Sequence, residues 1–109
     1  MKYIKLFEDR GYYDEIKIGD YVICYEKDAG TLENFLLENI GQYIKKNEGS
    51  AFYIIKYDNI PDELSSFFSP YIIESVTYYA REMFRAEILA FSSNIKDMET
   101  ALLANKYNL

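Results

Sequence analysis

The segment Asn47-Glu48-Gly49-Ser50 is the strongest local structural signal in this chain. It separates residues 42–46 from residues 51–58, two runs rich in β-branched and aromatic side chains. A short polar interruption with glycine between such runs is typical of a β-hairpin. Because a hairpin joins antiparallel neighbours, the sequence predicts an antiparallel sheet around these two strands.

The N-terminal part adds two expected strands and one helix. We expect strands at 3–7 and 15–26, with a loop at 11–14 and a bulge or tight turn where Gly19-Asp20 interrupts the second strand. Asp28-Ala29-Gly30 ends that strand. Thr31 can then cap a helix that stops at Gly41. The apolar face of this helix consists of Leu32, Phe35, Leu36, Asn39 and Ile40.

The C-terminal part is harder to interpret. Residues 70–86 fit a helix by spacing and a strand by composition, and Ser69 before Pro70 slightly favours a helix at the start. Residues 86–91 could end a helix, but we favour a last strand. A terminal helix capped by Ser93 or Asn94 should run to residue 104, with Asp97 and Glu99 in its first turn. Its inward stripe is expected to be Ile95, Met98 and Leu102.

Length and charge define the class of protein. The 109 residues fit one domain, with a core at about 1–60 and a C-terminal extension at about 62–109. The formal net charge of −6 disfavours binding to nucleic acid or anionic membrane, so a partner should be basic or neutral. No apolar run approaches the ~20 residues of a membrane span, and acidic residues interrupt the start before any signal-peptide core. We therefore expect a cytoplasmic protein.

Catalytic residue patterns are scarce. The chain has no His and a single Cys, Cys24, which excludes a Ser-His or Cys-His pair, a zinc cluster and an internal disulfide. The five glycines are too scattered for a phosphate-binding loop. Acidic pairs occur at Glu8-Asp9, Asp14-Glu15 and Asp62-Glu63, and we interpret them as surface acids. The prediction is no enzyme, cofactor or metal, with a metal-dependent carboxylate enzyme as the remaining alternative.

The main candidate site is a stretch in which acids and tyrosines alternate. Spaced carboxylates can imitate backbone phosphates, and tyrosine rings can occupy the positions of stacked bases. The simpler alternative is a hydrated surface with tyrosines packed into the core. The candidate partner-binding residues are Asp9, Tyr12, Tyr13, Asp14, Glu15, Asp20, Tyr21, Tyr25, Glu26 and Asp28.

Three segments carry a resemblance to SH3-like small barrels of the KOW type. They are Ile18-Gly19-Asp20-Tyr21-Val22-Ile23-Cys24, Asn39-Ile40-Gly41-Gln42-Tyr43-Ile44 and Tyr53-Ile54-Ile55-Lys56-Tyr57. The two ends of the chain are also similar to small tailed-phage proteins that carry such a core. The resemblance implies an α+β fold, a small antiparallel β-barrel or sheet with an inserted helix and a C-terminal helix. RNA binding, which such barrels can show, is not carried over to this chain, because the chain is acidic and lacks a basic stripe.

The functional expectation combines these points. We expect an acidic, non-enzymatic, phage-type protein that acts through protein–protein contact in the host cytoplasm. It would be an anti-CRISPR-like inhibitor that blocks a basic nucleic-acid-binding surface of a host defence complex. A phage structural, assembly or adaptor protein is the alternative.

Overall fold

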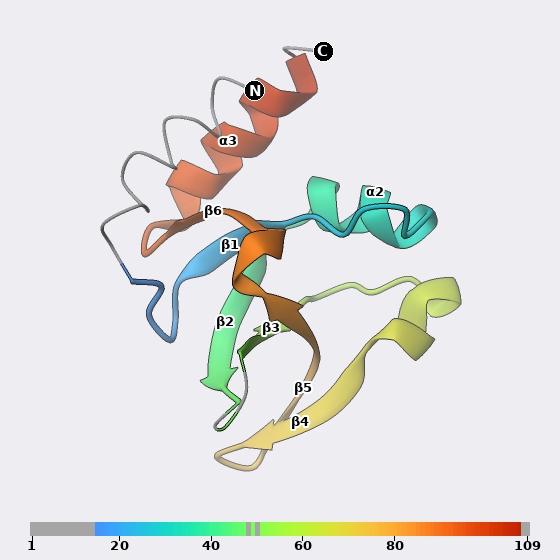
Figure 1. The fold of residues 1–109 in the computed structure, drawn as a ribbon, viewed down its shortest axis with the longest axis vertical. Helices are drawn as coiled ribbons and strands as arrows, with labels where there is room; N and C mark the ends of the chain where they lie inside the picture. The colour runs from blue at the N-terminus through green and yellow to red at the C-terminus, as the bar shows by residue number, and fades with distance from the viewer. Residues whose placement is uncertain (1–14, 48, 50, 108–109) are drawn as a thin grey trace.

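Six strands form one antiparallel sheet in the computed structural model, which describes residues 15–47, 49 and 51–107. The spatial order is β4-β5-β3-β2-β1-β6 (Figure 1). A helix is inserted between β1 and β2, and another follows β6, so the expected α+β class is confirmed. The predicted strand at 3–7 and loop at 11–14 lie outside the described residues. The strands are β1 (Tyr21–Cys24), β2 (Gly41–Lys46), β3 (Phe52–Lys56), β4 (Ser69–Ile73), β5 (Val76–Phe84) and β6 (Ile88–Ser92).

The predicted hairpin around Asn47-Glu48-Gly49-Ser50 is confirmed as β2 and β3. Tyr43 pairs with Ile55, and the register shifts by one residue before Lys45 pairs with Ile54. Gly49 has a φ of 81°, a left-handed conformation that glycine adopts without a steric cost. The local turn chemistry therefore determines this hairpin.

Residues 70–86 form most of a second hairpin, so the slight preference for a helix at their start was wrong. Ile73 of β4 pairs with Val76 of β5, and the two residues between them, Glu74 and Ser75, have φ values of 51° and 67°. Two left-handed residues in a two-residue loop are the pattern of a type I′ turn, which matches the twist of the strands. The β-branched and aromatic composition determined the structure here.

The predicted strand at 15–26 is shorter than expected, because only Tyr21–Cys24 is extended and paired. The expected tight turn is confirmed: Gly19 has a φ of 101°, and the Asp20 N–H donates to the Lys17 carbonyl at 2.9 Å. β6 pairs antiparallel with β1, which confirms the predicted last strand.

The inserted helix α2 (Thr31–Glu38) has different ends from those predicted. Gly30, not Thr31, occupies the N-cap position, and the helix ends at Asn39, whose Nδ2 donates to the Phe35 carbonyl at 2.9 Å. Gly41 is not the helix stop but the first residue of β2. A Cβ atom at Gly41 would lie 2.5 Å from Ile55 Cγ2, so close packing across the sheet requires glycine there.

The terminal helix α3 (Ile95–Tyr107) begins as predicted after Asn94, whose Oδ1 accepts a hydrogen bond from the Lys96 N–H at 2.9 Å. Met98 is fully buried, as expected, and Leu102 is half-buried. Ile95 does not belong to the inward stripe. It lies in the first turn, just after the chain leaves the sheet, and is 41% exposed.

Two clusters of buried side chains lie on opposite faces of the sheet. Because side chains alternate along a strand, Val22 and Cys24 pack with α2 on one face, while Ile23 packs with Met98 of α3 on the other. The α2 cluster also takes in the six-residue 3₁₀ helix η1 (Asp62–Phe67) through Leu64. Both helices therefore cover the β1 region.

The sheet is open, with β4 and β6 as its two end strands, so the closed SH3-like barrel is not confirmed. β5 and β6 pair with β3 and β1, and strands from both parts of the chain thus share one sheet. Among the residues that the structure describes, no helix is long and apolar enough to cross a membrane.

Candidate functional site

The acid–tyrosine stretch is divided by the fold. Asp9, Tyr12, Tyr13 and Asp14 lie outside the described residues. Glu15 is exposed, whereas Asp20 is buried and accepts a hydrogen bond from the Lys17 N–H at 2.9 Å. Asp20 thus holds the turn before β1, so its carboxylate has a structural role within its own loop.

Tyr21 and Glu26 point to opposite faces of the sheet. Tyr21 packs against the cluster under α3, while Glu26 crosses to β5 and forms an ion pair with Arg81 at 2.8 Å. The Arg81 side chain is only 14% exposed and also donates to the Phe67 carbonyl. Glu26 therefore links the segment that follows β1 to β5, on the face opposite Tyr21.

Tyr25 and Asp28 are brought together at the start of α2, beside Glu33. A hydrogen bond with the Glu33 carboxylate is the main cause that raises the pKa of Tyr25, and the charge of Asp28 adds to it. Of the six described candidates, these two form a small acidic corner at the surface.

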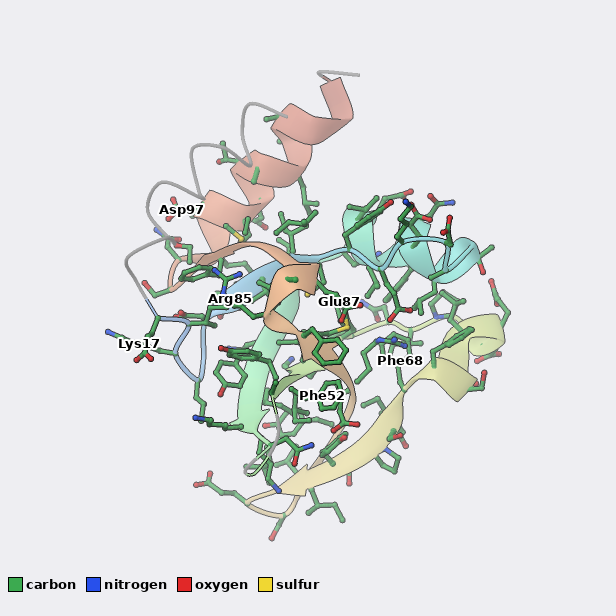
Figure 2. The ribbon with its side chains drawn as sticks, in the orientation of Figure 1. Lys17, Phe52, Phe68, Arg85, Glu87 and Asp97 are labelled. Atoms are coloured by element: carbon green, nitrogen blue, oxygen red, sulfur yellow. The ribbon has the colours of Figure 1, made fainter. Side chains whose placement is uncertain are left out.

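A separate hollow of about 490 Å³ lies where β3 ends and the chain crosses toward β4. We call it the hollow. Its walls include both aromatic and acidic residues, and its volume lies within the usual range of ligand pockets. Phe68 lies between α2 and the start of β4 (Figure 2), with its ring 6.0 Å from that of Phe35. The lining residues used below are Lys56, Asp58, Asp62, Phe68, Thr77 and Tyr79.

The wall of the hollow already holds one ammonium group. Lys56 Nζ lies 3.3 Å from an Asp58 oxygen and 5.7 Å from the centre of the Tyr78 ring. The Lys56 side chain is 18% exposed, whereas the Asp58 side chain is 77% exposed. A carboxylate beside an aromatic ring favours cations. Asp62, on the same hollow, is exposed and adds a second carboxylate.

The first residues of β5 extend beyond the end of β3. The last bond between them runs from the Tyr57 N–H to the Tyr79 carbonyl at 3.1 Å. The two-residue turn makes Ile73 and Val76 a hydrogen-bonded pair, and hydrogen-bonded pairs alternate with non-hydrogen-bonded pairs along the hairpin. The peptide groups that face β4 are therefore those of Val76, Tyr78 and Ala80. Thr77 therefore directs its N–H and C=O toward the hollow, where no described residue continues β3.

Beneath the hollow, Tyr57 and Cys24 form a buried polar pair. Burial raises the pKa of Cys24 from 9.0 to about 12, and burial likewise raises the pKa of Tyr57 well above its usual range. The thiol contributes to the raised pKa of Tyr57, yet Tyr57 Oη makes no hydrogen bond of ordinary geometry. A protonated, fully buried thiol is a poor nucleophile, so Cys24 belongs to the core.

The sequence reasoning did not single out the hollow. Its residues come from the end of β3, from η1 and from β5, and only the crossover of the chain brings them together. The available signal was the polar segment Asp58-Asn59 followed by Pro61-Asp62, which indicates a break after a strand. No group of three or more His, Cys, Asp or Glu side chains within the described ranges could hold a metal ion.

Comparison with known proteins identifies no family for this chain, so its function is inferred from the geometry described above. The chain matches no protein-family profile, no curated protein and no solved structure.

Proposed function

We propose that this chain is a non-enzymatic binding protein that acts through contact with a protein partner carrying a basic surface. The observation that carries the proposal is the β4–β5 hairpin, residues 69–80, which we call the ribbon. It lies at the opposite end of the sheet from α3 (Figure 1) and exposes Ile72 at 72%, Tyr79 at 55% and Val76 at 49%. Ile72 and Tyr79 share one face of the ribbon, because Ile72 pairs with Thr77, two residues before Tyr79. Exposed apolar side chains on one face are typical of an interaction site.

Charge favours a basic partner. The ribbon contains one charged residue, Glu74, and the adjoining hollow adds Asp58 and Asp62 against the single Lys56. The whole chain carries −6. A basic surface that normally binds nucleic acid, such as that of a host defence complex blocked by a phage inhibitor, has the complementary charge and is the partner we favour.

The low charge of the ribbon also supports a second candidate. A neutral apolar partner would contact Ile72 and Tyr79 without needing the acids, as in a phage structural, assembly or adaptor role. The two candidates differ in their response to salt, because charge attraction is screened and apolar contact is not.

The test is affinity capture by the immobilised chain from a lysate of its cellular host, at about 0.05 M and about 0.5 M salt. A basic partner should be retained at low salt and released at high salt, and it should lose bound oligonucleotide when the chain is added. Retention at both salt concentrations would favour the assembly role.

Matched variants locate the contact. Ile72→Ser with Tyr79→Ser should abolish capture, because both side chains lie on the same face of the ribbon. Ile18→Ser with Leu103→Ser removes two similarly exposed apolar side chains elsewhere, 63% and 56% exposed, and should leave capture unchanged. Equal losses for the two pairs would contradict the proposal.

A further inference from the structure

From the open edge of β5 and the charge of the hollow, we infer that an extended peptide segment of the partner adds to the sheet beside Thr77. That segment places an Arg or Lys side chain in the hollow. The inference rests on the proposed function and names the chemistry of the segment that the site takes. Strand addition of this kind gains affinity from main-chain hydrogen bonds and specificity from alternate side chains.

The edge of β5 offers unsatisfied backbone groups in line with a strand that stops early. β3 ends at Lys56, which pairs with Ala80, and the Tyr57 N–H makes the last bond, to the Tyr79 carbonyl. The Thr77 N–H and C=O continue this line with no backbone partner among the described residues. An added strand would form a hydrogen-bonded pair with Thr77 at the usual spacing of about 4.8 Å.

The outer edge of β4 is a poorer site for the same purpose. Ser69, Tyr71 and Ile73 direct their peptide groups toward β5, so the outward positions are Pro70 and Ile72. Pro70 has no N–H, which leaves Ile72 as the outward donor within β4. Proline on an edge strand prevents further pairing, so the partner strand is directed to β5 instead.

The hollow favours a cationic side chain on the added strand. A residue opposite Thr77 projects to the same face as Thr77 and Tyr79, because directly paired residues share a face. That face carries Phe68, and Asp62 lines the hollow beside it. Lys56, with Asp58 and the Tyr78 ring, lies on the opposite face, because Lys56 pairs with Ala80 and side chains alternate along a strand. Because Asp58 is paired with Lys56, Asp62 is the carboxylate that the hollow offers to an incoming guanidinium.

The test uses a synthetic probe, the capped peptide acetyl-Thr-Val-Arg-Val-Thr-amide, titrated into the purified ¹⁵N-labelled chain. Binding should shift the amide signals of Thr77 and Tyr79, with smaller changes at the distant α3. Replacing the Arg of the probe with Glu should weaken binding at least about tenfold, and so should methylating the backbone nitrogen of that Arg. Equal binding of all three peptides would overturn the inference.

Variants of the chain test the same geometry. Thr77→Pro removes the edge N–H but leaves the β4 pairing intact, as Pro70 does in its own strand, and should weaken the probe about tenfold or more. Thr77→Ser is the conservative control. Asp62→Asn should lose the preference for Arg, whereas Glu38→Gln and Glu99→Gln, changes of exposed acids on the two helices, should keep it. Unfolding midpoints check that each variant is folded.

The outcome is separable from that of the proposed function. A captured partner whose affinity is unchanged by Thr77→Pro would overturn strand addition and leave the binding function standing. The probe titration needs no partner, so a failed capture does not affect its result.

Discussion

The two ends of the sheet differ in what covers them. Around β1, α2 packs on one face and α3 on the other, and Val22, Ile23 and Cys24 are almost completely buried. At the ribbon, β5 continues past β3 and Ile72 stays 72% exposed. Stability should therefore come from the β1 end, while the ribbon leaves apolar side chains and backbone groups uncovered.

The largest expected difference between the two ends is a pair of truncations. Met98→Ala truncates a fully buried side chain of α3 that packs on the sheet, and should lower the free energy of unfolding by about 2–5 kcal/mol. Ile72→Ala on the ribbon should change it by no more than about 0.5 kcal/mol. Chemical denaturation of both variants measures the contrast, and similar losses would show that the ribbon belongs to the stabilising core.

Close packing inside the covered end gives the next effect. Gly41→Ala places a Cβ 2.5 Å from Ile55 Cγ2 and 2.8 Å from Tyr57 Cζ, and should cost about 1–3 kcal/mol by overpacking. Adding Ile55→Leu moves the branch away from that position and should recover part of the loss. Denaturation midpoints report both changes. A Gly41→Ala variant as stable as the parent would place Gly41 outside the close contact.

Which parts of this comparison the sequence could predict depends on where the determining contacts lie. The β2–β3 hairpin was predictable, because Gly49 adopts its left-handed φ within the turn itself. The ribbon was not, because Glu74 and Ser75 adopt the same region without being Gly or Asn. Gly41 was taken for a helix stop because its function depends on Ile55 and Tyr57, which lie elsewhere in the sequence.

The candidate site shows the same division. Neighbouring acids and tyrosines suggested one surface, yet strand alternation and the Arg81 ion pair separate Tyr21 from Glu26. The hollow depends on the crossover from β3 to β4, a long-range feature that no local pattern specifies. The basic partner inferred from composition stays a prediction, and the contact proposed on the ribbon was inferred from the fold.

Alkaline pH should weaken the covered end in particular. The pKa of Cys24 is about 12 in the folded chain against an ordinary 9.0, so folding favours the neutral thiol. That contribution is complete below pH 9 and is lost as the pH rises from 9 to 12, about 1 kcal/mol from pH 9 to 10. Burial of Tyr57 also lowers the stability as the pH rises, but from an ordinary pKa that is higher than that of Cys24. Unfolding measured at several pH values should show a flatter decline for Cys24→Ala, and an identical slope would contradict the assignment.

The unsatisfied hydroxyl at the same place predicts a small gain. Tyr57→Phe removes a buried Oη that lacks a hydrogen bond of ordinary geometry, and should be neutral or stabilise by up to about 1 kcal/mol. A double-mutant cycle with Cys24→Ala tests whether the thiol compensates the hydroxyl. A coupling energy near zero fits an unsatisfied group. A loss of stability in Tyr57→Phe that disappears in the Cys24→Ala background would instead show a genuine bond to sulfur.

The smallest effect on stability is expected at the outer edge of the ribbon, where it should be accompanied by a change in association. Pro70→Thr costs roughly 0.5 kcal/mol through the unfolded chain, but restores an outward N–H next to that of Ile72. Two uncovered β4 edges could then pair, because Ser69–Ile73 carries no charge to oppose it. Sedimentation should detect concentration-dependent dimers of Pro70→Thr and monomers of Pro70→Glu, which gains the same N–H together with a repelling charge. Dimers of both variants would mean that apolar contact, rather than strand pairing, drives association. Monomers of both variants would show that Pro70 is not what prevents the β4 edges from pairing.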